Sequence, residues 1–110
     1  MEIQELVDIF SLDRPSMQTH NTIESLIQLL RAEVDEFEAD HSPMELADIF
    51  LFTLSIANGL GIDLEEVSRE KLAFNTTRFK PSDFEGDYDE ARSKGKQREI
   101  EVKKDWSILP

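Results

Sequence analysis

The chain has 110 residues, a formal net charge of −12 and no cysteine. This length suits one domain or one subunit of a larger assembly. The excess of negative charge disfavours nucleic acids and anionic membranes as partners, because their phosphates would be repelled. The lack of cysteine excludes disulfides, thiolate zinc sites and a cysteine nucleophile.

The N-terminal segment is acidic and does not resemble a secretory signal. No apolar run approaches the roughly 20 residues that a membrane-spanning helix needs. We therefore expect a cytoplasmic protein with a single domain over residues 1–110. Its core is expected at about 21–81, followed by a charged tail at about 82–110.

Apolar residues at helical spacing predict an all-α chain, starting with a short helix from Glu2 to Phe10. The segment at 12–16, which contains a proline, is expected to break this helix. A second helix is expected to begin after a cap at Asn21 or Thr22 and to end near Asp40.

A third helix is predicted to begin at Ser42-Pro43, where serine caps the helix and proline occupies its first turn. It should end at about Asn58, where two glycines follow. A fourth helix should begin at Asp63 and end before Pro81. The charged tail beyond it is compatible with a loose helix, a short strand at 99–102 or a segment ordered by a neighbouring subunit.

The third helix is apolar around nearly its whole circumference between Leu46 and Ala57, with Asp48 its only charge. Such a helix must be covered on all sides, which three other helices in so short a chain can hardly achieve. The sequence therefore predicts a homo-oligomer, a dimer or a tetramer, built as a helical bundle.

Two pairs of acids interrupt the apolar faces of the second and third helices. Each pair has helical spacing, Glu33 with Glu36 and Glu45 with Asp48. If the two helices run antiparallel, all four carboxylates converge, and unpaired acids so placed would repel one another. Divalent cations can neutralise such a cluster, with the carboxylate oxygens as their ligands. The alternative is that these are ordinary surface charges, with Glu45 acting only as a helix cap.

The fourth helix places Lys71, Asn75 and Arg78 on one face. Two cations and an amide provide the donors that a phosphate chain requires. The alternative is ordinary surface charge, with the asparagine near a helix end.

Three segments, AEVDEFEAD, MELADIFLF and KLAFNTTRFKP, resemble the E-x-x-E, E-x-x-D and K-x-x-x-N-x-x-R/Y motifs of MazG-like nucleotide pyrophosphohydrolases. These belong to the all-α NTP pyrophosphatase superfamily, and the resemblance covers residues 21–81. The short length suggests the single-domain type. The resemblance implies a four-helix-bundle-type fold assembled as an oligomer. It also implies cleavage of an NTP or dNTP to a nucleoside monophosphate and pyrophosphate, in nucleotide-pool house-cleaning.

The same resemblance implies roles for individual residues. Mg²⁺, or Mn²⁺ in its place, would be bound by the four acids, of which Glu36 is the candidate general base. Contacts to phosphate or sugar would come from Lys71, Asn75 and Arg78. Base preference would be set by side chains around the acids, with candidates for stacking at Phe37, Phe52, Phe79 and Trp106.

Two other functions compete with this hypothesis. One is a non-catalytic acidic helical protein that binds a nucleotide or a partner. The other, a di-iron carboxylate bundle, would need Glu-x-x-His, and neither histidine of the chain completes that motif.

Overall fold

The computed structural model describes residues 2–20 and 22–106, with side chains described for 2–17 and 22–101. Within these ranges the chain is helical and contains no strand, which confirms the all-α prediction. The elements in chain order are α1 (Glu2–Leu12), α2 (Pro15–His20), α3 (Ile23–Ala39), α4 (Pro43–Leu60), α5 (Leu64–Arg78), the 3-10 helix η1 (Pro81–Glu85) and α6 (Tyr88–Trp106). They divide into two compact units, residues 1–67 and 68–110.

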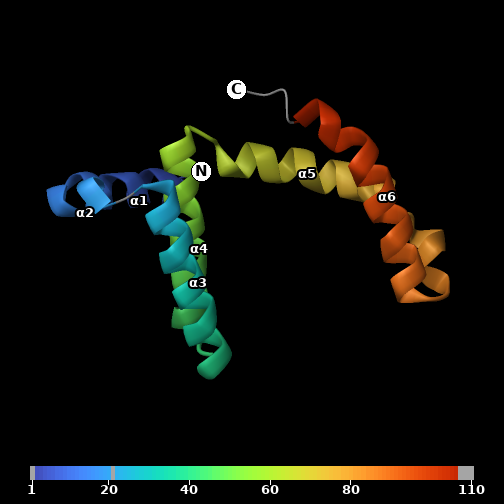
Figure 1. Cartoon of the computed structure of the whole chain (residues 1–110), viewed down its shortest axis with the longest axis horizontal. Helices are drawn as coiled ribbons and strands as arrows, with labels where there is room; N and C mark the ends of the chain where they lie inside the picture. Colours follow the sequence, from blue (N-terminus) through green and yellow to red (C-terminus); the bar gives the residue numbers. More distant parts are fainter. Residues whose placement is uncertain (1, 21, 107–110) are drawn as a thin grey trace. The chain divides into compact units, whose positions relative to one another are not determined.

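Helices α3 and α4 lie side by side in the first unit and are joined by a short turn (Figure 1). The Thr22 side chain caps α3 by accepting a hydrogen bond from Ser25 N at 3.1 Å. The Ser42 side chain caps α4 in the same way, from Glu45 N at 3.3 Å. At the other end of α4, Gly61 adopts the left-handed conformation with φ 68°, which glycine reaches without steric cost. These caps confirm the predicted boundaries of both helices to within two residues.

Helix α1 is fixed to the end of α4 by one buried amide, that of Gln4. Its Nε2 donates to Asn58 Oδ1 at 3.1 Å and to the Ile62 carbonyl at 2.6 Å. Its Oε1 accepts from Leu64 N at 3.1 Å. Through these three hydrogen bonds the amide joins α1 to the end of α4 and to the start of α5.

The region around Pro15 differs from the prediction. Helix α1 continues to Leu12, and Pro15 then begins a further helix, α2, where the sequence predicted only a break. Proline has no backbone N–H to donate, and in the first turn of a helix that N–H would have no partner within the helix, so Pro15 can begin α2. In the interior of a helix the same residue would break a hydrogen bond, so α1 ends before it.

The second unit contains most of α5, together with η1 and α6. Of the three structures considered for the charged tail, the helix is present, and it is 19 residues long. Its buried residues Ala91, Gly95 and Glu99 recur every fourth position and so form one face. Small side chains on this face allow close approach: a Cβ on Gly95 would lie 2.0 Å from Phe79 Cε1. An edge-to-face series then runs from Phe79 through Phe84 to Tyr88.

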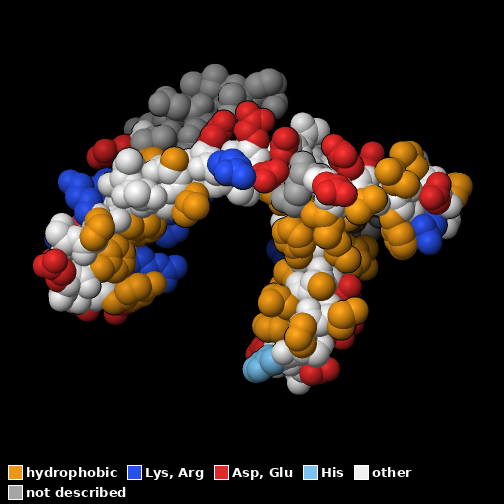
Figure 2. Space-filling view, turned by 180° about the vertical axis from the view of Figure 1, so that it is seen from behind, with side chains coloured by type: hydrophobic (Ala, Val, Ile, Leu, Met, Phe, Trp, Pro, Cys, Tyr) orange, Lys and Arg blue, Asp and Glu red, His pale blue; other side chains and the backbone are white. Residues whose placement is uncertain are grey.

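Apolar side chains gather along the α3–α4 pair, as Figure 2 shows. Several of them are exposed in the single chain, including Met44, Leu46 and Phe50 on α4 and Val34 on α3. No single helix in the described ranges has both the length and the apolar composition to cross a membrane. Helices α4 and α5, which meet at a bend, reach the required length and apolar composition only when they are counted together.

Candidate functional site

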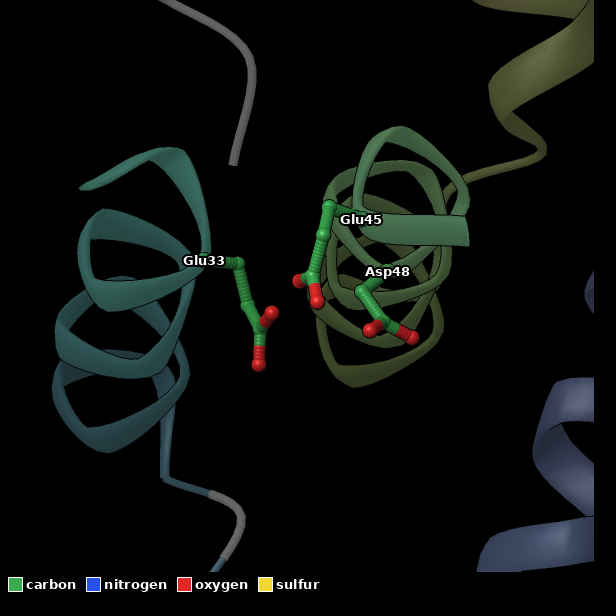
Figure 3. Close-up of side chains that lie close together, drawn as sticks. All are labelled: Glu33, Glu45 and Asp48. Carbon is green, nitrogen blue, oxygen red and sulfur yellow. The ribbon is translucent and has the colours of Figure 1, made fainter. Parts of the chain in front are cut away.

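Carboxylates from α3 and α4 converge in the first unit. Glu33, Glu45 and Asp48 each offer one oxygen, and these three oxygens lie within 4.8 Å of one another. Figure 3 shows Glu33 extending from its helix toward the two acids of the facing helix. The sequence predicted this convergence from helical spacing and the short turn. Glu45 lies in this group as well as in the first turn of α4.

The acids lie in an environment that opposes their charge. The Oε2 atoms of Glu33 and Glu45 are buried, and neither has a hydrogen-bond partner within the described part of the chain. Burial, together with the neighbouring carboxylates, raises the pKa of Glu33 from 4.5 to about 7. Burial and the same neighbours also raise the pKa of Glu45. Burial and the neighbouring acids thus both disfavour the ionised form of these two carboxyls.

Glu36, the fourth predicted acid, lies outside this group of three oxygens. It is solvent-exposed on α3, one turn after Glu33. After burial, a side-chain hydrogen bond with Glu36 and the charge of Glu36 raise the pKa of Glu33. The same two interactions raise the pKa of Glu45, so Glu36 contacts both acids. Three acids thus converge through one oxygen each, and Glu36 contacts two of them from a solvent-exposed position.

The donor set fits a hard divalent cation. Mg²⁺ and Mn²⁺ prefer oxygen ligands and neutralise adjacent carboxylates. A cation bound between the acids would take the two unpartnered Oε2 atoms as ligands. Its positive charge would favour the ionised carboxylates and so lower the pKa values again. The absence of cysteine from the chain excludes a thiolate site.

An apolar cavity of about 470 Å³ opens beside the acids in the same unit. Asp48 forms part of its wall. The remaining lining comes from α1, α2 and α4, and includes Leu6, Phe10, Met17, Leu51 and Phe52. Of the aromatic residues proposed to contact the base, Phe52 therefore lies at this cavity, whereas Phe37 packs against His41 with ring centroids 5.4 Å apart. The Trp106 side chain lies outside the described side chains.

The three predicted phosphate contacts form a cluster in the second unit. Arg78 Nε donates to Asn75 Oδ1 at 2.8 Å. Lys71 Nζ and Arg78 Nη1 both donate to Glu99, at 2.6 Å and 2.7 Å. The sequence analysis predicted that the first three share a helix face, but it did not find Glu99. Glu99 lies four residues after Gly95 on the face of α6 that Ala91 and Gly95 form, but its charge alone did not distinguish it from the other charged residues of α6.

Comparison with known proteins gives one informative similarity. The chain is 34% identical over 64 residues to a protein of cyanophage S-2L named dATP/dGTP diphosphohydrolase. The match covers 58% of this chain and 60% of the relative, so the chain spans less than two thirds of that protein. No protein-family model matches the chain. No solved structure matches it either.

Proposed function

We propose that the protein is a Mg²⁺-dependent nucleoside triphosphate pyrophosphohydrolase that cleaves a dNTP or NTP to the monophosphate and pyrophosphate. The observation that carries this proposal is the convergence of Glu33, Glu45 and Asp48 around two buried oxygens without partners among the described residues. A cluster of acids with this excess negative charge is suited to hold cations that in turn bind polyphosphate. The similarity to a dATP/dGTP diphosphohydrolase supports the same substrate class, with purine deoxynucleotides the first to test.

In the proposed reaction, one water molecule adds to a phosphorus atom and one P–O bond between the α- and β-phosphates breaks. Glu33, Glu45 and Asp48 would hold the metal. Bound Mg²⁺ would neutralise phosphate oxygens and lower the pKa of a coordinated water. Glu36, exposed beside the three acids, accepts the proton that the attacking water loses. The bridging oxygen leaves on the departing phosphate.

The cavity beside Asp48 accommodates the nucleoside. Its apolar lining suits the faces of a base and a sugar, whereas its acidic edge belongs to the metal cluster. Phe52 is the lining residue best suited to contact a base, because an aromatic ring offers a flat apolar surface. On the resemblance to the pyrophosphohydrolases, contacts to phosphate or sugar are assigned to Lys71, Asn75 and Arg78.

We further propose that the functional form is a homo-oligomer in which α3 and α4 of two copies pack together. The supporting observation is the exposure of apolar side chains on these helices: 77% for Met44 and 52% for Leu46. A second copy of the chain would remove these side chains from water and complete a four-helix bundle.

The proposed activity is tested by measuring pyrophosphate release from the common dNTPs and NTPs with and without Mg²⁺. Anion-exchange chromatography should then show a monophosphate and pyrophosphate as products. Glu45→Gln keeps the side-chain shape but loses the charge, and it should lower kcat by about 10²-fold or more. Glu38→Gln, an exposed acid on the same helix as Glu33, is the matched control. Release of a nucleoside diphosphate with free phosphate, or no turnover of any nucleotide, would contradict the proposal and favour a non-catalytic binding protein.

A further inference from the structure

The carboxylate of Glu99 lies at the centre of a group of cations in the second unit. Its Oε1 accepts from Lys71 Nζ at 2.6 Å, and its Oε2 accepts from Arg78 Nη1 at 2.7 Å. Lys96 Nζ approaches the same Oε2 at 3.4 Å. Glu99 is only 8% exposed, so both of its oxygens are committed to these partners in a largely buried position.

Arg78 connects Glu99 to Asn75. Its Nη1 donates to the Glu99 carboxylate, while its Nε donates to Asn75 Oδ1 at 2.8 Å. The guanidinium carbon also lies 4.3 Å from the centroid of the Phe79 ring, which restricts its movement. Because the Asn75 oxygen receives this hydrogen bond, the orientation of the amide is fixed and its NH₂ group faces away from Arg78.

The three residues that were assigned to the substrate differ in how exposed their side chains are. The side chain of Arg78 is 6% exposed, whereas that of Lys71 is 34% exposed and Asn75 is half-buried. A phosphate in solvent can therefore approach Lys71 and Asn75 more readily than Arg78. A buried ion pair such as Arg78–Glu99 also adds little stability over apolar side chains of similar volume, since both charges lose hydration.

From these contacts we propose that Glu99 is a positioning residue for the phosphate-binding side chains of the second unit. It holds the Lys71 ammonium directly and orients the Asn75 amide through Arg78. Lys71 and Asn75 then donate to phosphate or sugar oxygens of the substrate, and Arg78 acts behind them. This inference rests on the proposed function, which assigns Lys71, Asn75 and Arg78 to the nucleotide. It changes the role of Arg78 from a direct contact to a support, and it adds Glu99 of α6 as a second supporting residue.

The main test compares Glu99→Gln with Glu101→Gln, an exposed acid on the same helix. Glutamine has one neutral acceptor oxygen and an NH₂ group in place of the two charged oxygens of Glu99. It therefore cannot accept hydrogen bonds from both Lys71 and Arg78, and Lys71 and Asn75 are no longer held in position. We expect KM for dATP to rise about tenfold or more while kcat changes less than about threefold. Glu101→Gln should leave both constants unchanged. A purely structural role would lower the thermal midpoint without moving KM, and that result would overturn the inference.

Two further variants test the path through Arg78. Arg78→Lys keeps the charge but lacks the fork that contacts Asn75 and Glu99 together, so KM should rise as it does in Glu99→Gln. In the double variant Glu99→Gln/Asn75→Ala, the rise in KM should be smaller than the product of the two single effects, because both substitutions break one chain of contacts. An unchanged KM in Arg78→Lys, or fully multiplicative effects in the double variant, would contradict the path.

A binding measurement keeps this test separate from the test of the activity itself. Inorganic tripolyphosphate with Mg²⁺ should raise the thermal midpoint of the wild type and of Glu101→Gln, and should raise it much less in Glu99→Gln. If the wild type hydrolyses no nucleotide, the proposed activity fails while this comparison still decides the role of Glu99. If Glu99→Gln does not fold, Glu99→Asp replaces it under the same criteria, because the shorter acid keeps its charge but cannot reach both cations.

Discussion

Glu33 on α3 and Glu45 on α4 are twelve positions apart in the chain, yet each has an oxygen within 4.8 Å of the other. The buried Oε2 atoms of both residues have no hydrogen-bond partner among the described residues. Two carboxylates in this relationship repel each other when ionised and cannot both be well solvated. Ionising both carboxyls of the α3–α4 pair is therefore unfavourable without a cation between them.

We expect Mg²⁺ to raise the thermal midpoint of the protein, because the ion binds the folded acids and not the unfolded chain. A hundredfold excess over Kd corresponds to about 2.7 kcal/mol. Asp48→Ala should remove most of this increase, whereas Glu38→Gln should retain it. Differential scanning fluorimetry with a Mg²⁺ titration measures the effect, and an unchanged increase in Asp48→Ala would exclude the acids as the metal site.

The raised pKa of Glu33, about 7, makes the metal-free protein sensitive to pH. Between the ordinary value of 4.5 and about 7, the folded state keeps a proton that the unfolded state has lost. The contribution of Glu33 to stability is thus fully present below pH 4.5 and is lost as the pH rises through about 7. The free energy of unfolding without metal should decrease over this interval, as measured by urea denaturation.

The same shift predicts that Mg²⁺ binding releases protons. At pH 6 the ion must displace the proton of Glu33, whereas at pH 8 this carboxyl is already ionised. Isothermal titration calorimetry in buffers of different ionisation enthalpy should therefore show proton release at pH 6 and much less at pH 8. Equal proton release at both values would show that Glu33 does not titrate with the metal.

The sequence contains enough local information to predict α3, α4 and most of α5. Their ends depend on neighbouring residues, such as the Thr22 and Ser42 caps and the glycine at position 61. Convergence of Glu33 and Glu45 also follows from local features, because a short turn forces two adjacent helices to lie side by side. The same reasoning failed at Pro15, since proline both ends one helix and begins the next.

The contacts of Glu99 could not be predicted in the same way. They depend on how α6 packs against the end of α5, and few apolar residues on α6 indicate which face is buried. Gly95 and Ala91 create that face by their small size, and size at a contact is not visible in helical periodicity. The Gln4 amide is a similar case, because its partners follow 54 or more positions later.

Gly95→Ala should destabilise the second unit, because the added Cβ would lie 2.0 Å from the Phe79 ring and force it to move. Overpacking of this kind costs about 1–3 kcal/mol. Ser93→Ala, at an exposed position of the same helix, is the matched control. Hydrogen exchange of the α6 amides should increase in the first variant and not in the second. Equal protection in both would show that the close contact is not required.

Replacing Leu46 by Glu should dissociate the proposed oligomer, because a charge would then be buried between two copies of α4. Ile100→Glu alters a side chain of similar exposure on α6 and serves as the control. Light scattering over a range of protein concentrations measures the mass of each variant. A wild-type protein that is monomeric at micromolar concentration, or a Leu46→Glu variant with unchanged mass, would refute this arrangement of α3 and α4.

Phe52→Ala tests whether the cavity beside Asp48 holds the nucleoside. Removal of the ring takes away an apolar surface that the base would contact, so KM for dATP and dGTP should rise about tenfold. Binding of inorganic tripolyphosphate, which has no base, should be unchanged when it is followed by the thermal midpoint with Mg²⁺. Leu60→Ala, an exposed apolar residue of α4 that does not line the cavity, should leave both measurements as in the wild type. If Phe52→Ala weakens nucleotide and tripolyphosphate to the same extent, the ring supports the acid cluster and the base binds elsewhere.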